Sequence, residues 1–259
     1  MRYATREIRL ASALVEAADT LVEDFEATRY LQRVSDHCVE LLDARAAGVM
    51  LIDGGRSVSL AASSRHERVA LDLLEAQHGG GPCLDSYGSG KAVPPVSIRV
   101  AHAAARWPDF TERALRHDIV TTFAVPLRRR ETLLGALNVF VPTLPDTSPA
   151  DEVTSEVQVA QALADAAALG LQNRHTYARY RTLSGQLQEA LSSRVRIEQA
   201  KGMLAERWSV PADEAFVALR QYARRRRLPL DRVASAVIEG VAEDADLRRR
   251  TDGSADGPA

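Results

Sequence analysis

The chain has 259 residues, of which 46% are apolar and 26% charged, with a formal net charge of −2, enough apolar material for one large packed domain or two smaller ones. Its two cysteines, Cys38 and Cys83, are too few for a disulfide scaffold or a four-thiolate metal site. No apolar run approaches the ~20 residues of a membrane span, and the first residues carry charges throughout, unlike a signal peptide, so we expect a cytoplasmic protein without membrane contact.

The first elements alternate between helical and strand patterns. Apolar residues recur at helical spacing over residues 7–25 and again over 29–42, which predicts two amphipathic helices. The period then changes, because two short apolar runs, Ala46–Ile52 and Val58–Ala62, flank the turn Asp53-Gly54-Gly55. Short apolar runs around such a turn predict a β-hairpin.

The next segments predict two more helices with an irregular strand between them. Helical spacing over residues 65–77 ends at the glycine-rich loop Gly79–Pro82. Lys91–Ile98 is extended, but its two prolines confine it to a sheet edge. A second helix is expected to begin at Trp107-Pro108 and to end near His117.

Two further strands are predicted at Val120–Leu127 and Leu133–Val141, joined by the charged turn Arg128–Glu131. Strands interleaved with helices, without a strict alternation of strand, helix and strand, are typical of an α+β domain. A break rich in proline follows this domain, at Pro142, Pro145 and Pro149.

The longest helix is predicted from about Pro149 to Trp208, because residues 150–210 contain no proline. Apolar residues lie three to four positions apart along it, which is compatible with a coiled-coil seam. Arg174 and Arg181 interrupt the seam. The residues at this spacing are Leu163, Ala167, Leu171, Tyr180, Leu183, Leu187 and Leu191. We expect this helix to pair with a second copy of the chain and to form a homodimer.

Residues 194–238 predict three short amphipathic helices with many arginines. Residues 182–241 hold ten basic and seven acidic residues, whereas the remainder holds 23 basic and 28 acidic residues. Arg194 and Lys201 are seven positions apart and share a face, as do Arg220, Arg224 and Arg227. Arginine matches phosphate oxygens through two parallel hydrogen bonds, so this module is expected to contact a polyanion.

The C-terminal pattern resembles the ANTAR domain, a helical RNA-binding output module of bacterial regulators. Ser209 stands where that family often has glycine, so we expect a different cap at this helix end. The matching residues are Arg194, Ile197-Glu198-Gln199-Ala200-Lys201-Gly202, Leu204, Ala215-Phe216, Leu219-Arg220, Ala223, Leu230 and Val233-Ala234.

The resemblance implies binding to paired RNA stem-loops and disruption of a transcription terminator. Exposed loop bases suit this target, because side chains can stack on them. Gly202 would let a helix or a nucleotide approach closely, and Tyr222 and Trp208 are candidates either for stacking or for packing. The candidate RNA-binding residues are Arg194, Lys201, Gly202, Arg220, Arg224, Arg227 and Arg232.

An earlier series of motifs resembles the GAF domain, a sensory α+β fold with a central antiparallel sheet. The combination of both domains in this order is similar to the GAF–ANTAR regulators of actinobacteria. The motifs are Gly81-Pro82-Cys83-Leu84, Trp107-Pro108-Asp109-Phe110, Ala124-Val125-Pro126-Leu127 and Leu134-Gly135-Ala136-Leu137.

The GAF resemblance implies a pocket for an unknown small molecule, and analogy of fold places it near Cys83, Leu84, Tyr87 and Phe123. We predict no particular cofactor. Cys83 is the one candidate for a covalent chromophore link, although a small loop residue explains it better. The histidines lack metal-ligand spacing, so we predict no metal site. They are His66, His78, His102 and His117.

These patterns predict an N-terminal helix (1–28), a GAF domain (29–145), a connecting helix (149–192), an ANTAR domain (193–242) and a disordered tail (243–259). Two other functions stay open. The C-terminal module could be a DNA-binding helix-turn-helix, or the chain could be a sensor enzyme. The sequence lacks a phosphate-binding glycine loop and kinase nucleotide motifs, so we expect no catalytic residues.

Overall fold

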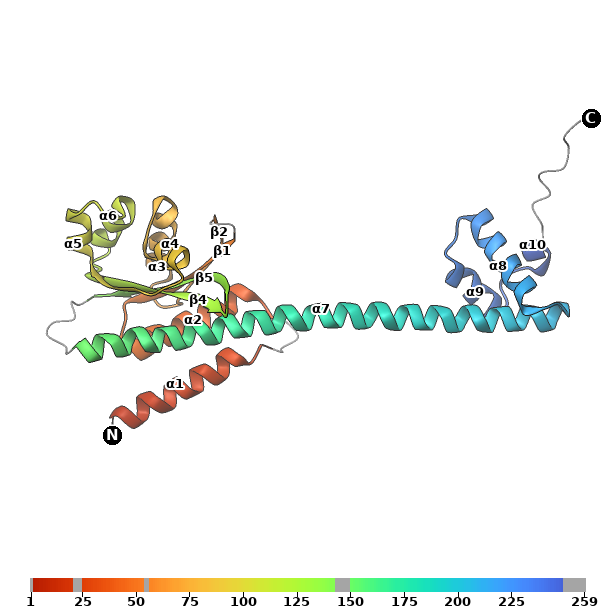
Figure 1. The fold of residues 1–259 in the computed structure, drawn as a ribbon, viewed down its shortest axis with the longest axis horizontal. Helices are drawn as coiled ribbons and strands as arrows, with labels where there is room; N and C mark the ends of the chain where they lie inside the picture. Colours follow the sequence, from red (N-terminus) through yellow and green to blue (C-terminus); the bar gives the residue numbers. More distant parts are fainter. Residues whose placement is uncertain (1, 21–24, 54–55, 143–149, 249–259) are drawn as a thin grey trace, which may run out of the picture. The chain divides into compact units, whose positions relative to one another are not determined.

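The computed structural model describes residues 2–20, 25–53, 56–142 and 150–248 (Figure 1). The chain divides into two compact units, Met1–Tyr177 and Ala178–Ala259, called unit 1 and unit 2 below. The predicted turn residues Gly54 and Gly55 and the last eleven residues of the predicted tail lie outside the described residues. So do Pro145 and Pro149 of the proline-rich break.

Unit 1 is built on a five-stranded antiparallel sheet with the strand order β2-β1-β5-β4-β3. The predicted α+β class is therefore confirmed. Strand β3 lies at the sheet edge, as its two prolines predicted, because proline has no N–H to donate to a second neighbour. The strands are β1 (Ala46–Asp53), β2 (Arg56–Ala62), β3 (Val93–Ser97), β4 (Thr121–Arg129) and β5 (Thr132–Val141).

Helices cover both faces of this sheet (Figure 1). Four helices and a short 3-10 turn lie over one face, and α2 (Ala27–Leu42) covers the other with the first part of α7 (Ala150–Trp208). The helices α4 and α5 were not predicted, because each is short and α4 begins inside the glycine- and proline-rich stretch. The elements over the first face are α3 (Glu67–Glu75), η1 (Ala76–Gly79), α4 (Pro82–Ser89), α5 (Ile98–Ala103) and α6 (Pro108–Arg116).

The N-terminal helix α1 (Arg2–Ala18) packs on α2. The hydroxyl of Tyr30 in α2 donates to the carbonyl oxygen of Ala17 at 2.6 Å and lies 3.4 Å from that of Ala167 in α7. Gly170 makes this approach possible, because a Cβ there would overlap the Tyr30 hydroxyl and the Ala17 carbonyl. One buried hydroxyl thus joins three helices of unit 1.

The helix α7 has 59 residues, and the prediction of one long helix is confirmed. Its first part is buried in unit 1, where alanines alternate with Leu163 along the contact face. The small side chains allow the helix to approach α2 and the sheet closely. The buried residues of this part are Ala160, Leu163, Ala164, Ala167 and Ala168.

Unit 2 packs α8 (Ala212–Arg226), α9 (Leu230–Ile238) and α10 (Asp244–Arg248) against the end of α7. Ser209, between α7 and α8, takes a φ of 53°, the left-handed conformation that favours glycine. Ser209 thus takes a backbone conformation that glycine adopts at lower cost. The core residues are Ala200, Leu204, Ala215, Leu219, Ala223, Val233, Ala234, Val237 and Leu247.

The helix α10 corrects one prediction. Residues 243–248 were included in the predicted disordered tail (243–259), but Leu247 is only 1% exposed within the core of unit 2. Acidic residues of α10 also bind arginines of α7 and α8. The prediction of disorder is wrong for this segment, because a single apolar anchor and long-range ion pairs leave little periodic signal.

Candidate nucleic-acid interface

The end of α7 carries three of the predicted RNA-binding residues. Arg194 is exposed, whereas Lys201 is half-buried and its Nζ lies 2.5 Å from Oε2 of Glu198. Gly202 is exposed, and beyond its own turn of helix a Cβ there would meet no atom of the described residues within 4 Å. No helix approaches Gly202 in the described residues, so close packing within the chain does not explain this glycine.

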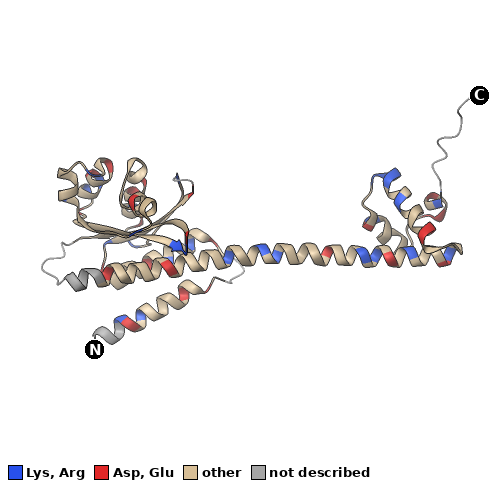
Figure 2. Cartoon of the chain, in the orientation of Figure 1, with Lys and Arg blue, Asp and Glu red and all other residues tan. Residues whose placement is uncertain are grey.

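The exposed face of α8 brings together three predicted arginines. Arg220, Arg224 and Arg227 lie four and three positions apart, on the side of the helix turned away from its buried residues. The Arg220 guanidinium lies 5.7 Å from the Phe216 ring centroid. Arg227 ends the helix with a left-handed φ of 55°. Figure 2 shows the blue arginine cluster at the end of α8 remote from α7.

Two further arginines, Arg225 and Arg226, were not among the predicted residues. Their guanidinium groups lie 5.5 and 5.8 Å from the ring centroid of Tyr222. Arg226 also binds the carboxylate of Asp246, at 2.7 Å. Tyr222 therefore already has two cationic neighbours, which favours the packing interpretation of this residue over base stacking.

The first turn of α9 carries Arg232, which is exposed. Its neighbour Asp231 lies 3.6 Å from Arg196 of α7, measured between Oδ2 and Nη2. The pair links the start of α9 to α7. The acidic residue of the Asp231-Arg232 sequence therefore lies against α7, and the basic one is exposed.

Trp208 lies at the end of α7, beside a groove of about 460 Å³ that α7, α8 and α10 line. The Arg248 guanidinium lies 4.7 Å from the Trp208 ring centroid. Partial burial opposes ionisation of Asp244, but Trp208 and the cations of Arg207 and Arg248 lower its pKa below the ordinary value. Trp208 therefore belongs to the packing of α10.

The predicted small-molecule pocket does not assemble as expected. Cys83, Leu84 and Tyr87 belong to α4 and to the core cluster on its side of the sheet, whereas Phe123 belongs to the core on the opposite face. The alternation of side chains along β4 places Ala124 on the α4 side instead. The prediction is wrong for Phe123.

Cys83 is fully buried, and its backbone N–H donates to the side-chain oxygen of Gln77 at 2.8 Å. Burial raises the pKa of the Cys83 thiol to about 12, despite the hydrogen bond with Gln77. On the same face of the sheet, the hydroxyl of Thr122 donates to Oδ1 of Asn138 at 2.8 Å. The Asn138 amide nitrogen is buried without a hydrogen-bond partner, so this face holds one unused donor.

The four candidate histidines contact other residues of the chain. His117 binds Asp72 at 2.8 Å, beside the Arg113–Asp72 ion pair at 2.6 Å. The ring of His66 contacts the carbonyl of Arg45. Over the ranges that the structure describes, no group of three or more acidic, cysteine and histidine side chains could hold a metal ion.

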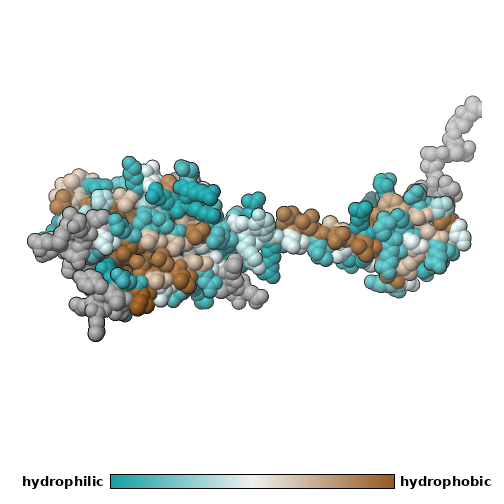
Figure 3. Space-filling view, turned by 60° about the horizontal axis from the view of Figure 1, so that its bottom comes forward, coloured by the Kyte–Doolittle hydropathy of each residue, from teal (hydrophilic) through white to brown (hydrophobic). Residues whose placement is uncertain are grey.

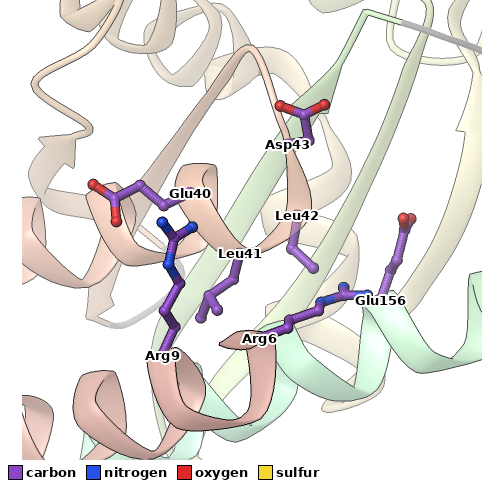
Figure 4. A pocket seen from close by; sticks show the side chains of 7 residues that line it. All are labelled: Arg6, Arg9, Glu40, Leu41, Leu42, Asp43 and Glu156. Carbon is purple, nitrogen blue, oxygen red and sulfur yellow. The ribbon is translucent and has the colours of Figure 1, made fainter. Parts of the chain in front are cut away.

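A second cavity, of about 450 Å³, lies in unit 1 between α1, the end of α2 and α7 (Figure 4). It presents two guanidinium and three carboxylate groups, so its charge favours neither an anion nor a cation. The lining residues are Arg6, Arg9, Glu40, Leu41, Leu42, Asp43 and Glu156.

Comparison with protein families assigns both units. The model described as GAF domain matches residues 27–172, and the model described as ANTAR domain matches residues 185–238. The chain belongs to the GAF-domain family and carries an ANTAR domain after it, as the motifs predicted. A GAF domain is a sensor and an ANTAR domain is an RNA-binding antitermination module. The protein is therefore a signal-regulated regulator built from two regulatory, non-catalytic domains.

Solved structures resemble unit 1 only distantly. The GAF domain of a phosphoenolpyruvate-protein phosphotransferase from Acinetobacter is 12% identical, with a TM-score of 0.49 over 66% of this chain and 95% of that one. The A. aeolicus nlh2 GAF domain in an inactive state is 13% identical, with a TM-score of 0.46 over 65% and 99%.

A free methionine-R-sulfoxide reductase from Neisseria meningitidis is 16% identical, with a TM-score of 0.44 over 67% of this chain and 94% of that one. Comparison with curated proteins gave no significant match. In the described part of the chain, no helix has a stretch long and apolar enough to cross a bilayer.

Proposed function

We propose that this protein is a cytoplasmic, signal-responsive antiterminator that binds paired stem-loops in nascent RNA under control of its GAF domain. The observation that carries the proposal is the exposed arginine face of α8, formed by Arg220, Arg224 and Arg227 within the ANTAR domain. Guanidinium groups at this spacing can each donate two hydrogen bonds to a phosphate.

The lack of ion pairs at these arginines, within the described residues, supports the proposal. Among the described residues, no ion pair engages Arg220, Arg224 or Arg227, so binding a phosphate would not first break such a pair. Lys201 differs, because it already pairs with Glu198. We therefore expect the α8 face to contribute more binding free energy than Lys201.

Dimer formation is the second part of the proposal. Tyr180, Leu183, Leu187, Leu191 and Val195 of α7 are each 50 to 66% exposed. At 100° per residue they fall within an arc of roughly 120°, which is the width of an apolar stripe that packs against a partner helix. Brown atoms mark apolar side chains along this part of α7 in Figure 3. The same stripe on a second copy is its proposed partner.

Dimerisation would place two ANTAR domains on one RNA. When two weak sites are joined, the second binding event becomes intramolecular and gains effective concentration without any new contact. Paired stem-loops provide two equivalent targets. A signal at the GAF domain is proposed to act by changing how the two α7 helices pair.

The test replaces two exposed arginines of α8. We expect Arg220→Ala/Arg224→Ala to weaken binding to a paired-hairpin RNA at least about tenfold, since hydrogen bonds to charged groups contribute roughly 1.5–3 kcal/mol each. Affinity is measured by fluorescence anisotropy over a series of salt concentrations. The matched control is Arg179→Ala/Arg181→Ala, which removes the same charge from exposed positions of α7 outside the ANTAR domain.

Unchanged affinity in the α8 variant, with a wild-type circular dichroism spectrum, would contradict the proposal. A double variant Lys201→Ala/Arg220→Ala should show an intermediate loss. Competition between hairpin RNA and duplex DNA separates the proposal from its alternative. A preference for duplex DNA would favour a helix-turn-helix factor, although the α9 face is mainly small and apolar.

A further inference from the structure

The helix α10 adds an acidic segment to a basic domain, beyond the residues 185–238 that the ANTAR model matches. Oδ1 of Asp244 lies 2.9 Å from Nη1 of Arg207 at the end of α7, and Oδ2 of Asp246 lies 2.7 Å from Nη2 of Arg226 in α8. Arg225 donates to the backbone carbonyl of Asp246. Three arginines of unit 2 are thus engaged by two residues of α10.

These contacts divide the arginine run of α8 into two pairs. Arg225 and Arg226 are engaged by α10, whereas Arg224 and Arg227 are exposed and have no ion pair among the residues that the structure describes. Leu247, which is 1% exposed, anchors α10 in the core. The aspartates are therefore held at their arginines by an apolar contact independent of the charges.

We propose that α10 is an acidic clamp that withholds Arg207, Arg225 and Arg226 from RNA and so sharpens the preference of the protein for structured targets. The inference rests on the proposed RNA-binding function. Unstructured RNA is attracted mainly through counterion release at phosphates, in proportion to the number of cations that it reaches. Withholding three cations lowers the affinity of the protein for every polyanion. Arg220, Arg224 and Arg227 of the α8 face stay available to bind the paired stem-loops.

The ion pairs of α10 are weak enough to be displaced by a strongly bound RNA. Asp244, Asp246, Arg207 and Arg226 are partly exposed, with side-chain exposures between 31 and 53%, and exposed ion pairs contribute roughly 0.2–1 kcal/mol each. Anchoring by Leu247 keeps the aspartates at high effective concentration, so a flexible polyanion must displace both to gain the arginines. Specificity is a difference of affinities, and a device that acts against wrong partners raises it.

The test uses the full chain with Asp244→Asn/Asp246→Asn, which removes the charges and keeps Leu247. The matched control, Glu206→Gln/Glu239→Gln, removes two exposed carboxylates of the same unit that form no ion pair in the described structure. Binding to an unstructured oligouridine and to a paired-hairpin RNA is measured over a series of salt concentrations.

For oligouridine, the aspartate variant should bind about three- to tenfold more tightly than the wild type. Each additional phosphate contact steepens the dependence of log K on log salt by about 0.7 for a single strand. Release of Arg207 and Arg226, the two arginines whose carboxylate partners the variant removes, therefore predicts a slope steeper by about 1.4. The control should keep the wild-type slope. Equal slopes for the two variants would overturn the clamp.

A second comparison identifies the released cations. Adding Arg207→Ala/Arg226→Ala to the aspartate variant should abolish the gain, and the same arginine substitutions alone should change oligouridine affinity less than about twofold. A large loss from the arginine substitutions alone would show that the wild type already uses these arginines, and would overturn the clamp.

The two proposals fail in different ways. If the wild type shows no preference for paired hairpins, the proposed function fails, while the slopes on oligouridine still decide the clamp. If no variant binds either RNA at low salt, both proposals fall.

Discussion

The part of α7 around Leu163 and the part around Leu187 have the same helical spacing of apolar residues, but the first is buried and the second is exposed. Leu163 is fully buried between α2 and the sheet of unit 1, whereas Leu187 is 63% exposed. Alanines flank the buried leucine, and Gln186 and Gln188 flank the exposed one. The comparison teaches that helical spacing predicts an apolar face, whereas the residues beside that face indicate whether the chain itself covers it.

The apolar side chains of the two parts therefore have different partners. Small residues beside Leu163 allow close approach to other elements of the same chain, so its burial contributes to folding. The stripe from Tyr180 to Val195 buries little area within one chain, so its apolar side chains contribute when a second helix covers them.

The largest expected effect is the loss of the proposed dimer when acidic residues replace leucines in the exposed part of α7. Leu183→Asp/Leu187→Asp should raise the dimer dissociation constant at least about a thousandfold, because burial of each leucine contributes roughly 1.5–3 kcal/mol and the new carboxylates repel each other. Analytical ultracentrifugation measures the constant. Thr182→Asp/Gln186→Asp, on the opposite side of the helix, is the control. A dimer that survives the leucine substitutions would show that the stripe is not the interface.

The next effect concerns the buried part. Leu163→Ala should lower the free energy of unfolding of unit 1 by about 2–5 kcal/mol, through lost burial and the cavity that remains. Leu187→Ala should leave this unit unchanged. Trp107 reports on unit 1 by fluorescence in urea when Trp208, in unit 2, is replaced by phenylalanine. Similar losses from both substitutions would mean that the exposed part also stabilises unit 1.

Two glycines of α7 sharpen the comparison further. Gly170→Ala should destabilise unit 1 by about 1–3 kcal/mol, since the added Cβ overlaps the Tyr30 hydroxyl and the Ala17 carbonyl. Gly185→Ala, where a Cβ meets nothing within 4 Å, should stabilise the helix by about 0.5–1 kcal/mol. Thermal melts followed by circular dichroism distinguish the two signs. Stabilisation by both would disprove the tight junction at Gly170.

The smallest effect removes one hydroxyl. Burial raises the pKa of Tyr30 to about 12, so this phenol is a neutral donor at neutral pH. Tyr30→Phe should cost about 0.5–1.5 kcal/mol through the lost hydrogen bond to Ala17, while Tyr180→Phe on the exposed part should change stability by less than about 0.3 kcal/mol. Urea titration measures both, and equal values would contradict the role of Tyr30.

Much of unit 1 could be predicted from period alone. The structure contains the strands predicted from the apolar runs on either side of Asp53 and of Arg130. It also contains the edge strand predicted from the extended, proline-containing segment Lys91–Ile98. The helices α4 and α5 could not be predicted, because their stability comes from packing on the sheet more than from an amphipathic repeat.

The candidate sites were harder to predict than the fold. Assigning Phe123 to the pocket required the face of β4 to be known, and a shift of one residue reverses that face. The role of Arg225 and Arg226 depends on α10, whose aspartates follow them by about twenty positions. Period and composition carry no signal for contacts of this kind.

The two cysteines lie on opposite sides of the sheet, Cys38 in the core beside α2 and Cys83 in the core beside α4. Burial raises the pKa of both thiols to about 12, and the thiolate is the form that reacts with alkylating reagents. Each cysteine is thus protected from reagents as long as its own layer stays closed. The rate at which each thiol is alkylated therefore measures the opening of one layer, so the sensor domain carries an intrinsic probe for each half of its interior.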